Sequence, residues 1–203
     1  MKTQMRFQKI LMLVSLIITA ITFVFGLFFL TGGLGYAGNY ITVNGVDLIG
    51  AQEFVDTITK GYVKTFINLA IVFIVLAAVL YITSCNKRRN YYITNYIAIG
   101  LFVAFALAMV IYIFIMVGVA KDLYVNSIDW ERVALQVADH PEWPMSKTEN
   151  YQFIVGYLVA VIILIDAVLL VLSTVWKVLL MKGEKALLAK SAKTEVGEAE
   201  EVA

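Results

Sequence analysis

Four long apolar stretches occupy most of this chain and set the main limit on what it can fold into. They cover residues 10–30, 65–86, 91–120 and 151–176, and Asp166 is the only charged side chain within them. A helix needs about 20 predominantly apolar residues to cross a bilayer whose hydrocarbon core is about 30 Å thick. The pattern therefore predicts an all-α membrane protein, a bundle of four transmembrane helices.

The composition agrees with this fold and leaves little room for a soluble domain. Hydrophobic residues make up 61% of the 203 residues and charged residues 15%, against about 45–50% and 25% in soluble proteins. We expect one bundle over residues 1–180, followed by a tail over residues 181–203 that is first amphipathic and then, from residue 194, disordered. The predicted spans are residues 10–30, 65–85, 93–120 and 152–176, joined outside by loops 31–64 and 121–150.

The basic residues predict the orientation of the four spans. Eleven of the sixteen lie on one side: Lys2, Arg6, Lys9, Lys87, Arg88, Arg89, Lys177, Lys182, Lys185, Lys190 and Lys193. Cytoplasmic loops carry an excess of Lys and Arg, so both termini are expected in the cytoplasm. The first apolar run, 21 residues long, exceeds the 7–15 of a signal-peptide core and is expected to remain as a span. We expect a multi-pass protein of the plasma or inner membrane, and the absence of cysteine pairs and glycosylation sequons outside favours a bacterial inner membrane.

Cysteine and histidine are too scarce for several kinds of site. Cys85 and His140 are the only residues of their types, which excludes an internal disulfide, an iron–sulfur cluster and a haem held by two histidines. No catalytic, metal-binding or nucleotide-binding motif is present elsewhere. We expect no enzymatic activity, no cofactor, no metal site and no nucleic-acid partner.

The two outside loops are predicted to have local structure. Asn44-Gly45 lies between two β-prone runs, a strong signal for a hairpin over residues 40–49. A short helix should follow over residues 51–60, with Phe54, Val55 and Ile58 on one face. This loop either covers the span ends or forms a docking surface.

The second outside loop is acidic and aromatic. Ser127 can cap a short amphipathic helix whose apolar stripe begins at Trp130 and which Pro141 ends. Trp130 and Trp143 either anchor this loop in the outer headgroup layer or contact a partner protein.

Small residues recur at helical spacing within three spans. Gly100, Ala104 and Ala108 form a ridge in the third span, and Gly156 and Ala160 begin a looser one in the fourth. Such residues let another helix backbone approach closely. We expect the Gly100–Ala104–Ala108 ridge to face a neighbouring helix of the bundle, or else to point outward toward a second protein. In the first span Ser15, Thr19, Thr22 and Gly26 share one face.

Asp166 is the residue whose position most needs an explanation. An acid within a membrane costs at least ~2.5–3.5 kcal/mol on insertion scales and normally faces the bundle interior. Thr19 and Thr22 should lie at a similar depth, and Ser173 shares a helix face with Asp166. We expect Asp166 to be protonated and bonded to Thr19 or Thr22. The alternative is a carboxylate that binds protons or cations.

The layout of four spans with a hairpin in the first outside loop resembles that of claudins in topology alone. Claudin-like loops carry a Trp and a cysteine pair, and residues 31–64 contain neither. No family is therefore assigned. We expect a non-catalytic subunit or scaffold in the lipid bilayer that associates with other membrane proteins through its outside loops and small-residue helix faces, in a homo- or hetero-oligomer. The alternative is a small cation- or proton-coupled transporter or channel that uses Asp166.

Overall fold

The structure is a computed structural model that describes residues 2–31, 51–85, 93–131, 135 and 151–201. Within these ranges the regular structure is helical and no strand is present. The elements in chain order are α1 (Lys2–Thr31), α3 (Ala51–Phe54), the π-helix η1 (Val55–Val63), α4 (Lys64–Cys85), α5 (Ile93–Asp122), the π-helix η3 (Leu123–Ser127) and α7 (Tyr151–Glu201).

Four of these helices are long and apolar enough to cross a membrane. The candidate spans are Arg6–Phe29, Gln52–Cys85, Ile93–Ser127 and Phe153–Leu188. The outward faces of the same helices carry large apolar side chains, among them Ile17, Val75, Leu101 and Leu158, each more than half exposed. A helix that is apolar all round is buried or lies in lipid. The chain is therefore a multi-pass membrane protein with four candidate spans.

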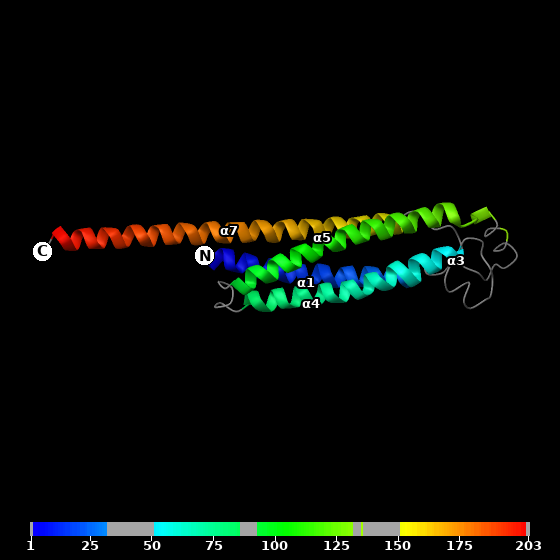
Figure 1. Ribbon diagram of the computed structural model, residues 1–203, viewed down its shortest axis with the longest axis horizontal. Coiled ribbons are helices and arrows are strands. Elements are labelled where there is room, and N and C mark those ends of the chain that lie inside the picture. The colour runs from blue at the N-terminus through cyan, green and yellow to red at the C-terminus, as the bar shows by residue number, and fades with distance from the viewer. Residues whose placement is uncertain (1, 32–50, 86–92, 132–134, 136–150, 202–203) are drawn as a thin grey trace.

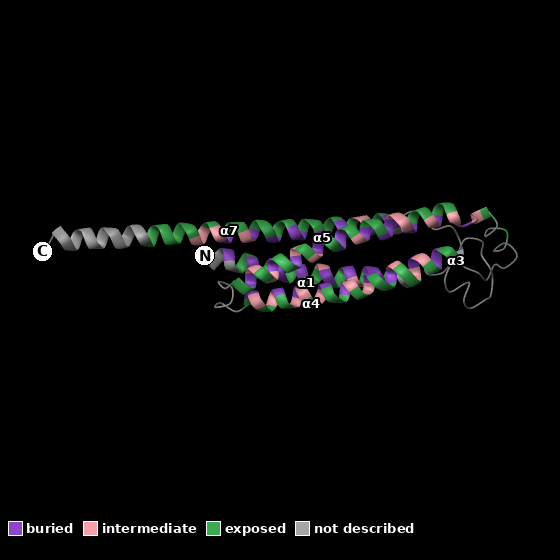
Figure 2. Cartoon of the chain, viewed as in Figure 1, coloured by how far each residue is buried: buried purple, intermediate pink, exposed green. Residues whose placement is uncertain are grey.

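The four long helices run side by side, and each packs on two neighbours. α1 packs mainly on α4 and also on α7, while α5 packs mainly on α7 and also on α4. Both termini lie at the same end of the molecule in Figure 1, which we call the termini end; α3 lies at the opposite, loop end. Buried and exposed residues alternate along each helix of the bundle (Figure 2).

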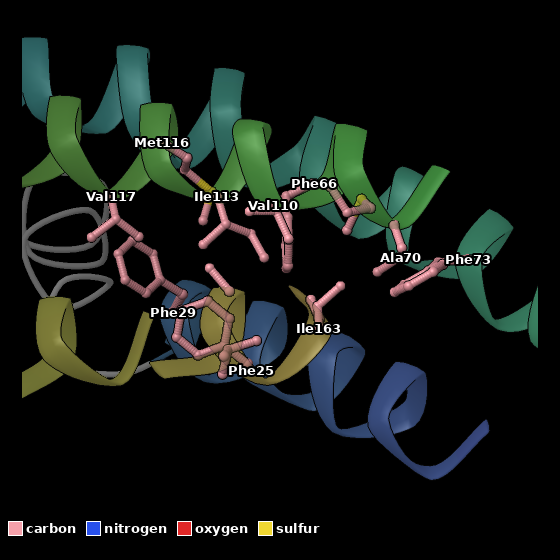
Figure 3. Packing of buried hydrophobic residues seen from close by; sticks show 14 of the residues in the cluster. Phe25, Phe29, Phe66, Ala70, Phe73, Val110, Ile113, Met116, Val117 and Ile163 are labelled. Carbon is pink, nitrogen blue, oxygen red and sulfur yellow. The ribbon is translucent and has the colours of Figure 1, made fainter. Parts of the chain in front are cut away.

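Aromatic and aliphatic side chains from all four helices fill the core toward the loop end. Figure 3 shows Phe25 and Phe29 of α1 close to Val117 of α5. The ring of Phe25 also meets that of Phe66 on α4 edge to face, with centroids 6.1 Å apart. Lipid supplies no hydrophobic drive between helices, so close packing of this kind holds the bundle together.

The segment predicted to end the first outside loop runs into its span without a break. The helix predicted over residues 51–60 is present as α3 and the beginning of η1, but it continues directly into α4. Phe54, Val55 and Ile58 are buried, as the predicted face requires. The predicted hairpin over residues 40–49 lies outside the described residues. In the second loop Trp130, Glu131 and Leu135 are helical. The predicted cap at Ser127 is wrong, because Ser127 ends η3 and Ile128 is extended. Residues 132–134 and 136–140 of the predicted helix lie outside the described residues.

α7 is much longer than a membrane crossing requires. Its 51 residues correspond to about 77 Å of helix, and it runs on past the N-terminus in Figure 1. The predicted disorder from residue 194 is wrong as far as Glu201, because the helix continues to that residue. The segment contains no proline and is rich in Ala, Glu, Lys and Leu, which are good helix formers.

Candidate functional site in the α1–α7 seam

Asp166 of α7 points into the bundle and is bonded to α1. Its side chain is only 3% exposed, and the hydroxyl oxygen of Ser15 lies 3.0 Å from its Oδ1. The same hydroxyl oxygen lies 3.0 Å from the carbonyl oxygen of Leu11. A protonated Asp166 can donate to Ser15 while Ser15 donates to Leu11, so that each proton has an acceptor. We call this interface between α1 and α7 the seam.

The predicted bond from Asp166 to Thr19 or Thr22 is wrong in register. Both threonine hydroxyls donate within α1, Thr19 to the carbonyl of Leu16 and Thr22 to that of Ile18, each over 2.8 Å. The prediction aligned the two spans by counting from an assumed inner surface. In the structure α1 begins already at Lys2, so Asp166 meets a residue one turn earlier. The predicted polar face is correct, since Ser15, Thr19 and Thr22 are all buried.

Four further buried polar residues lie between Asp166 and the termini end of the seam. Gln4 and Gln8 come from α1, Ser173 and Lys177 from α7, and each is at most 3% exposed. The Gln4 amide donates to the carbonyl of Ser173 over 3.5 Å, which aligns the two helices. The sequence does hold the signal for this row. Residues 4, 8 and 15 share one face of a helix, as do residues 166, 173 and 177.

Lys177 departs most from the sequence-based expectation, which placed it just beyond the fourth span with the basic residues of the cytoplasmic side. Its side chain is buried, and its Nζ lies 5.0 Å from the ring centroid of Tyr96 on α5. An ammonium over an aromatic face is stabilised by the ring quadrupole. Asn95, next to Tyr96, is also fully buried and accepts a long hydrogen bond of 3.4 Å from Thr83 of α4. Polar side chains from all four helices thus lie near the termini end.

Two side chains in this row have buried polar atoms without partners. Neither the amide nitrogen nor the amide oxygen of Gln8 forms a hydrogen bond, and neither does the hydroxyl of Ser173. Leaving a buried donor or acceptor unpaired costs about 1–3 kcal/mol per group. Ser173, which the sequence placed on the Asp166 face, does lie on it. Gln8 was missed.

One of the two predicted small-residue ridges is buried in the bundle and the other is exposed. Gly156 and Ala160 lie inside the bundle, and a Cβ placed on Gly156 would be only 2.6 Å from Val117. Gly100, Ala104 and Ala108 are exposed, and a Cβ on Gly100 would have nothing within 4 Å. The expectation that the Gly100–Ala104–Ala108 ridge packs inside the bundle is therefore wrong. α5 buries its other face, which carries the larger Phe102, Met109 and Ile113.

At the loop end, Trp130 is held by its own chain. Its indole N–H donates to the carbonyl of Tyr124 over 2.8 Å. The ring centroids of Trp130 and Tyr124 are 4.7 Å apart. Tyr124 also meets Phe54 and Phe153 edge to face. These contacts tie η3 to α3 and α7. Trp143, Asn44 and Gly45, the other predicted contact residues of the outside loops, lie outside the described residues.

The loop end also carries a shallow groove of about 310 Å³, lined by Asp56, Thr57, Gly61, Tyr62, Thr65 and Tyr112. Its only carboxylate, Asp56, pairs with Lys60 over 2.6 Å. Among the described residues no group of three or more His, Cys, Asp or Glu side chains is placed to hold a metal ion. The sequence of the chain matches no protein-family model and no curated protein, and its fold matches no solved structure.

Proposed function

We propose that the chain is a non-catalytic membrane subunit or scaffold that binds another membrane protein through the outward face of α5. The observation that carries this proposal is the exposure of Gly100, Ala104 and Ala108 on that face. Small residues let two helix backbones approach closely and are enriched where transmembrane helices associate. In the isolated chain this ridge has no helix against it.

The outward faces of the other long helices provide the comparison. α4 exposes Ile71, Val72 and Val75, and α7 exposes Leu158, Ile162 and Ile165. Among the exposed residues of α1 in its span only Ala20 is small. Within the described spans, three exposed glycine or alanine residues at successive spacings of four occur on α5 alone. This distribution favours one preferred side for association.

The enclosure of Asp166 supports a structural role for the seam. The acid is buried and bonded to Ser15 of the same chain. A carboxylate that binds substrate normally faces a cavity or water. The seam around Asp166 instead joins two helices of one bundle.

A proton-coupled transporter is the second candidate, and a specific observation favours it. Gln8 and Ser173 bury polar atoms without partners on one side of Asp166. An unsatisfied buried polar group needs an explanation, and a bound water or ion is one of the usual ones. For either function we propose that the termini face the cytoplasm, on the strength of the basic residues.

The experiment that tests the subunit proposal is extraction of the native protein in a mild detergent, followed by identification of what co-purifies. Ala104→Leu should release the partner, because a larger side chain prevents close approach of a second helix. It should not unfold the monomer, because Ala104 is exposed. Ala20→Leu, an equivalent change on the outward face of α1, is the matched control and should retain the partner.

Two results would contradict the subunit proposal. The first is that the wild-type protein is extracted with no stoichiometric partner, including a second copy of itself. The second is that Ala104→Leu and Ala20→Leu retain the partner equally well. The second result would leave association possible elsewhere but would remove the role of α5.

A further inference from the structure

From the geometry we infer that the termini half of the seam is a proton path, through which Asp166 exchanges its proton with water at the termini end alone. The ligand is the proton together with the water molecules that carry it. This inference does not depend on whether the chain is a subunit or a transporter.

The first support is the line of polar groups between Asp166 and the termini end. Ser173 lies seven residues from Asp166, and Gln8 lies seven residues from Ser15, so each is about 10 Å along its helix. Gln4 and Lys177 come one further turn along the same two helices. All four side chains are buried, so the line lies within the bundle and not on its lipid surface.

The second support is that the middle of this line has free hydrogen-bonding capacity. Both polar atoms of the Gln8 amide and the hydroxyl of Ser173 are buried and unpartnered. The amide offers a donor and an acceptor, and so does the hydroxyl. A water molecule that reaches this level therefore finds groups able to orient it and to pass a proton along. Such free groups are unusual, because most buried polar groups in proteins already have a hydrogen-bond partner.

The third support is that the opposite half of the seam is closed. Toward the loop end, Thr19 and Thr22 satisfy their hydroxyls within α1. Beyond them the rings of Phe25 and Phe29 of α1 lie with their centroids 5.4 Å apart, and Figure 3 shows both near Val117 of α5. A Cβ on Gly156 would lie 3.2 Å from the Phe25 ring, so no space remains between these helices. Among the described residues, buried side-chain donors and acceptors without a partner therefore lie only on the termini side of Asp166.

The fourth support is the charge distribution, which selects the proton over a metal cation. The buried side chains of α4 and α5 in the described spans include no charged residue. Among all the described residues, Asp166 of α7 is the only buried carboxylate. A single carboxylate gives a metal cation too few ligands.

Between Gln8 and Asp166 the path crosses one apolar layer. Met12 of α1 and Leu170 of α7 are buried at this level. Water crosses it during fluctuations of the seam and accepts the proton of the Asp166 carboxyl, which leaves a carboxylate that accepts from Ser15. The returning proton restores the acid. Exchange should accordingly be slow, and the residues on the path should control its rate.

The test measures exchange of the Asp166 carboxyl proton for deuterium by infrared spectroscopy, with the full-length protein in nanodiscs transferred into heavy water. Asp166→Asn identifies the carboxyl band by removing it. Gln8→Met keeps the size of the side chain but removes its polar atoms, and should slow exchange about tenfold by depriving the passing water of a hydrogen bond. Ser173→Ala should slow it in the same direction. Thr22→Val, on the closed side, is the matched control and should change the rate less than about twofold.

A purely structural role for these residues gives different results. Backbone amide exchange of α7, measured in the same samples, should be equal in Gln8→Met and Thr22→Val, so that a general stiffening of the bundle is recognised. The inference is overturned if Gln8→Met and Ser173→Ala both leave the carboxyl rate unchanged, or if Thr22→Val slows it equally. It is also overturned if Asp166→Asn removes no protonated carboxyl band. Should Gln8→Met fail to fold, Ser173→Ala decides.

Discussion

The side chains of Ser15 and Asp166 are 151 residues apart in the sequence and 3.0 Å apart in the structure. This bond joins the first long helix to the last and closes the ring of four helices. It also sets how far α7 is displaced along α1, because a shift of one turn would place Asp166 beside Thr19. The polar seam, the packing at Gly156 and the burial of Lys177 all depend on this alignment.

Removing the Ser15 hydroxyl should weaken the bundle modestly. We expect Ser15→Ala to lower the free energy of unfolding by ~0.6 kcal/mol, and by no more than about 1.7, the range found for hydrogen bonds between transmembrane helices. Asp166→Asn should be milder, because the amide keeps a donor and an acceptor at the same place. Unfolding of each variant in mixed micelles measures both values. If the double variant loses the full sum of the two single losses, the residues do not interact.

Close helix contact at Gly156 should be intolerant of even one methyl group. A Cβ there would lie 2.6 Å from Val117, so Gly156→Ala should destabilise the bundle by about 1–3 kcal/mol. Gly100→Ala is the control, because a Cβ at Gly100 meets nothing within 4 Å. That change should be neutral or should stabilise α5 by up to about 1 kcal/mol. Thermal unfolding in detergent compares the two, and equal effects would contradict the assignment of the inward face of α7.

The Trp130 indole should anchor η3 at the loop end. Trp130→Phe retains an aromatic ring but removes the hydrogen bond to the Tyr124 carbonyl, at an expected cost of about 1 kcal/mol. Proteolysis of the loop end should then become faster in native conditions. Trp176→Phe serves as control, because Trp176 is exposed and lies on α7. An unchanged rate in Trp130→Phe would mean that the indole is not a structural anchor.

The orientation in the membrane is tested by labelling single cysteines in a Cys85→Ser background. Lys60 and Glu184 are exposed and lie near opposite ends of the bundle. A membrane-impermeant thiol reagent added to intact cells should label Lys60→Cys directly, and Glu184→Cys only after permeabilisation, because the basic residues place the termini inside. The reverse pattern would invert the proposed topology.

Much of the fold could be predicted from the sequence because uninterrupted apolar runs leave few alternatives in a membrane. The polar face of α1 could also be predicted, since Ser15, Thr19 and Thr22 repeat at helical spacing. The partner of Asp166 could not. Its identity depends on how far two antiparallel helices are displaced, and a displacement of one turn changes no pattern in either sequence.

The direction of the Gly100–Ala104–Ala108 ridge could not be predicted for a different physical reason. In water a polar face shows which side of a helix is outside, but both faces of α5 are apolar because one meets protein and the other lipid. Small residues then fit either side. The charge of Lys177 placed it outside the fourth span, whereas in the structure its ammonium lies against the ring of Tyr96 from another helix.

The unbroken course of α7 gives the C-terminal segment a mechanical property. Residues 178–201 continue the helix over about 36 Å beyond Lys177. A straight helix acts as a lever, so a tilt of about 10° in the membrane portion would displace Glu201 by roughly 6 Å. Small rearrangements along the seam, including any that admit water beside Gln8, would thus be amplified into sideways movements of the end of this segment, parallel to the bilayer plane.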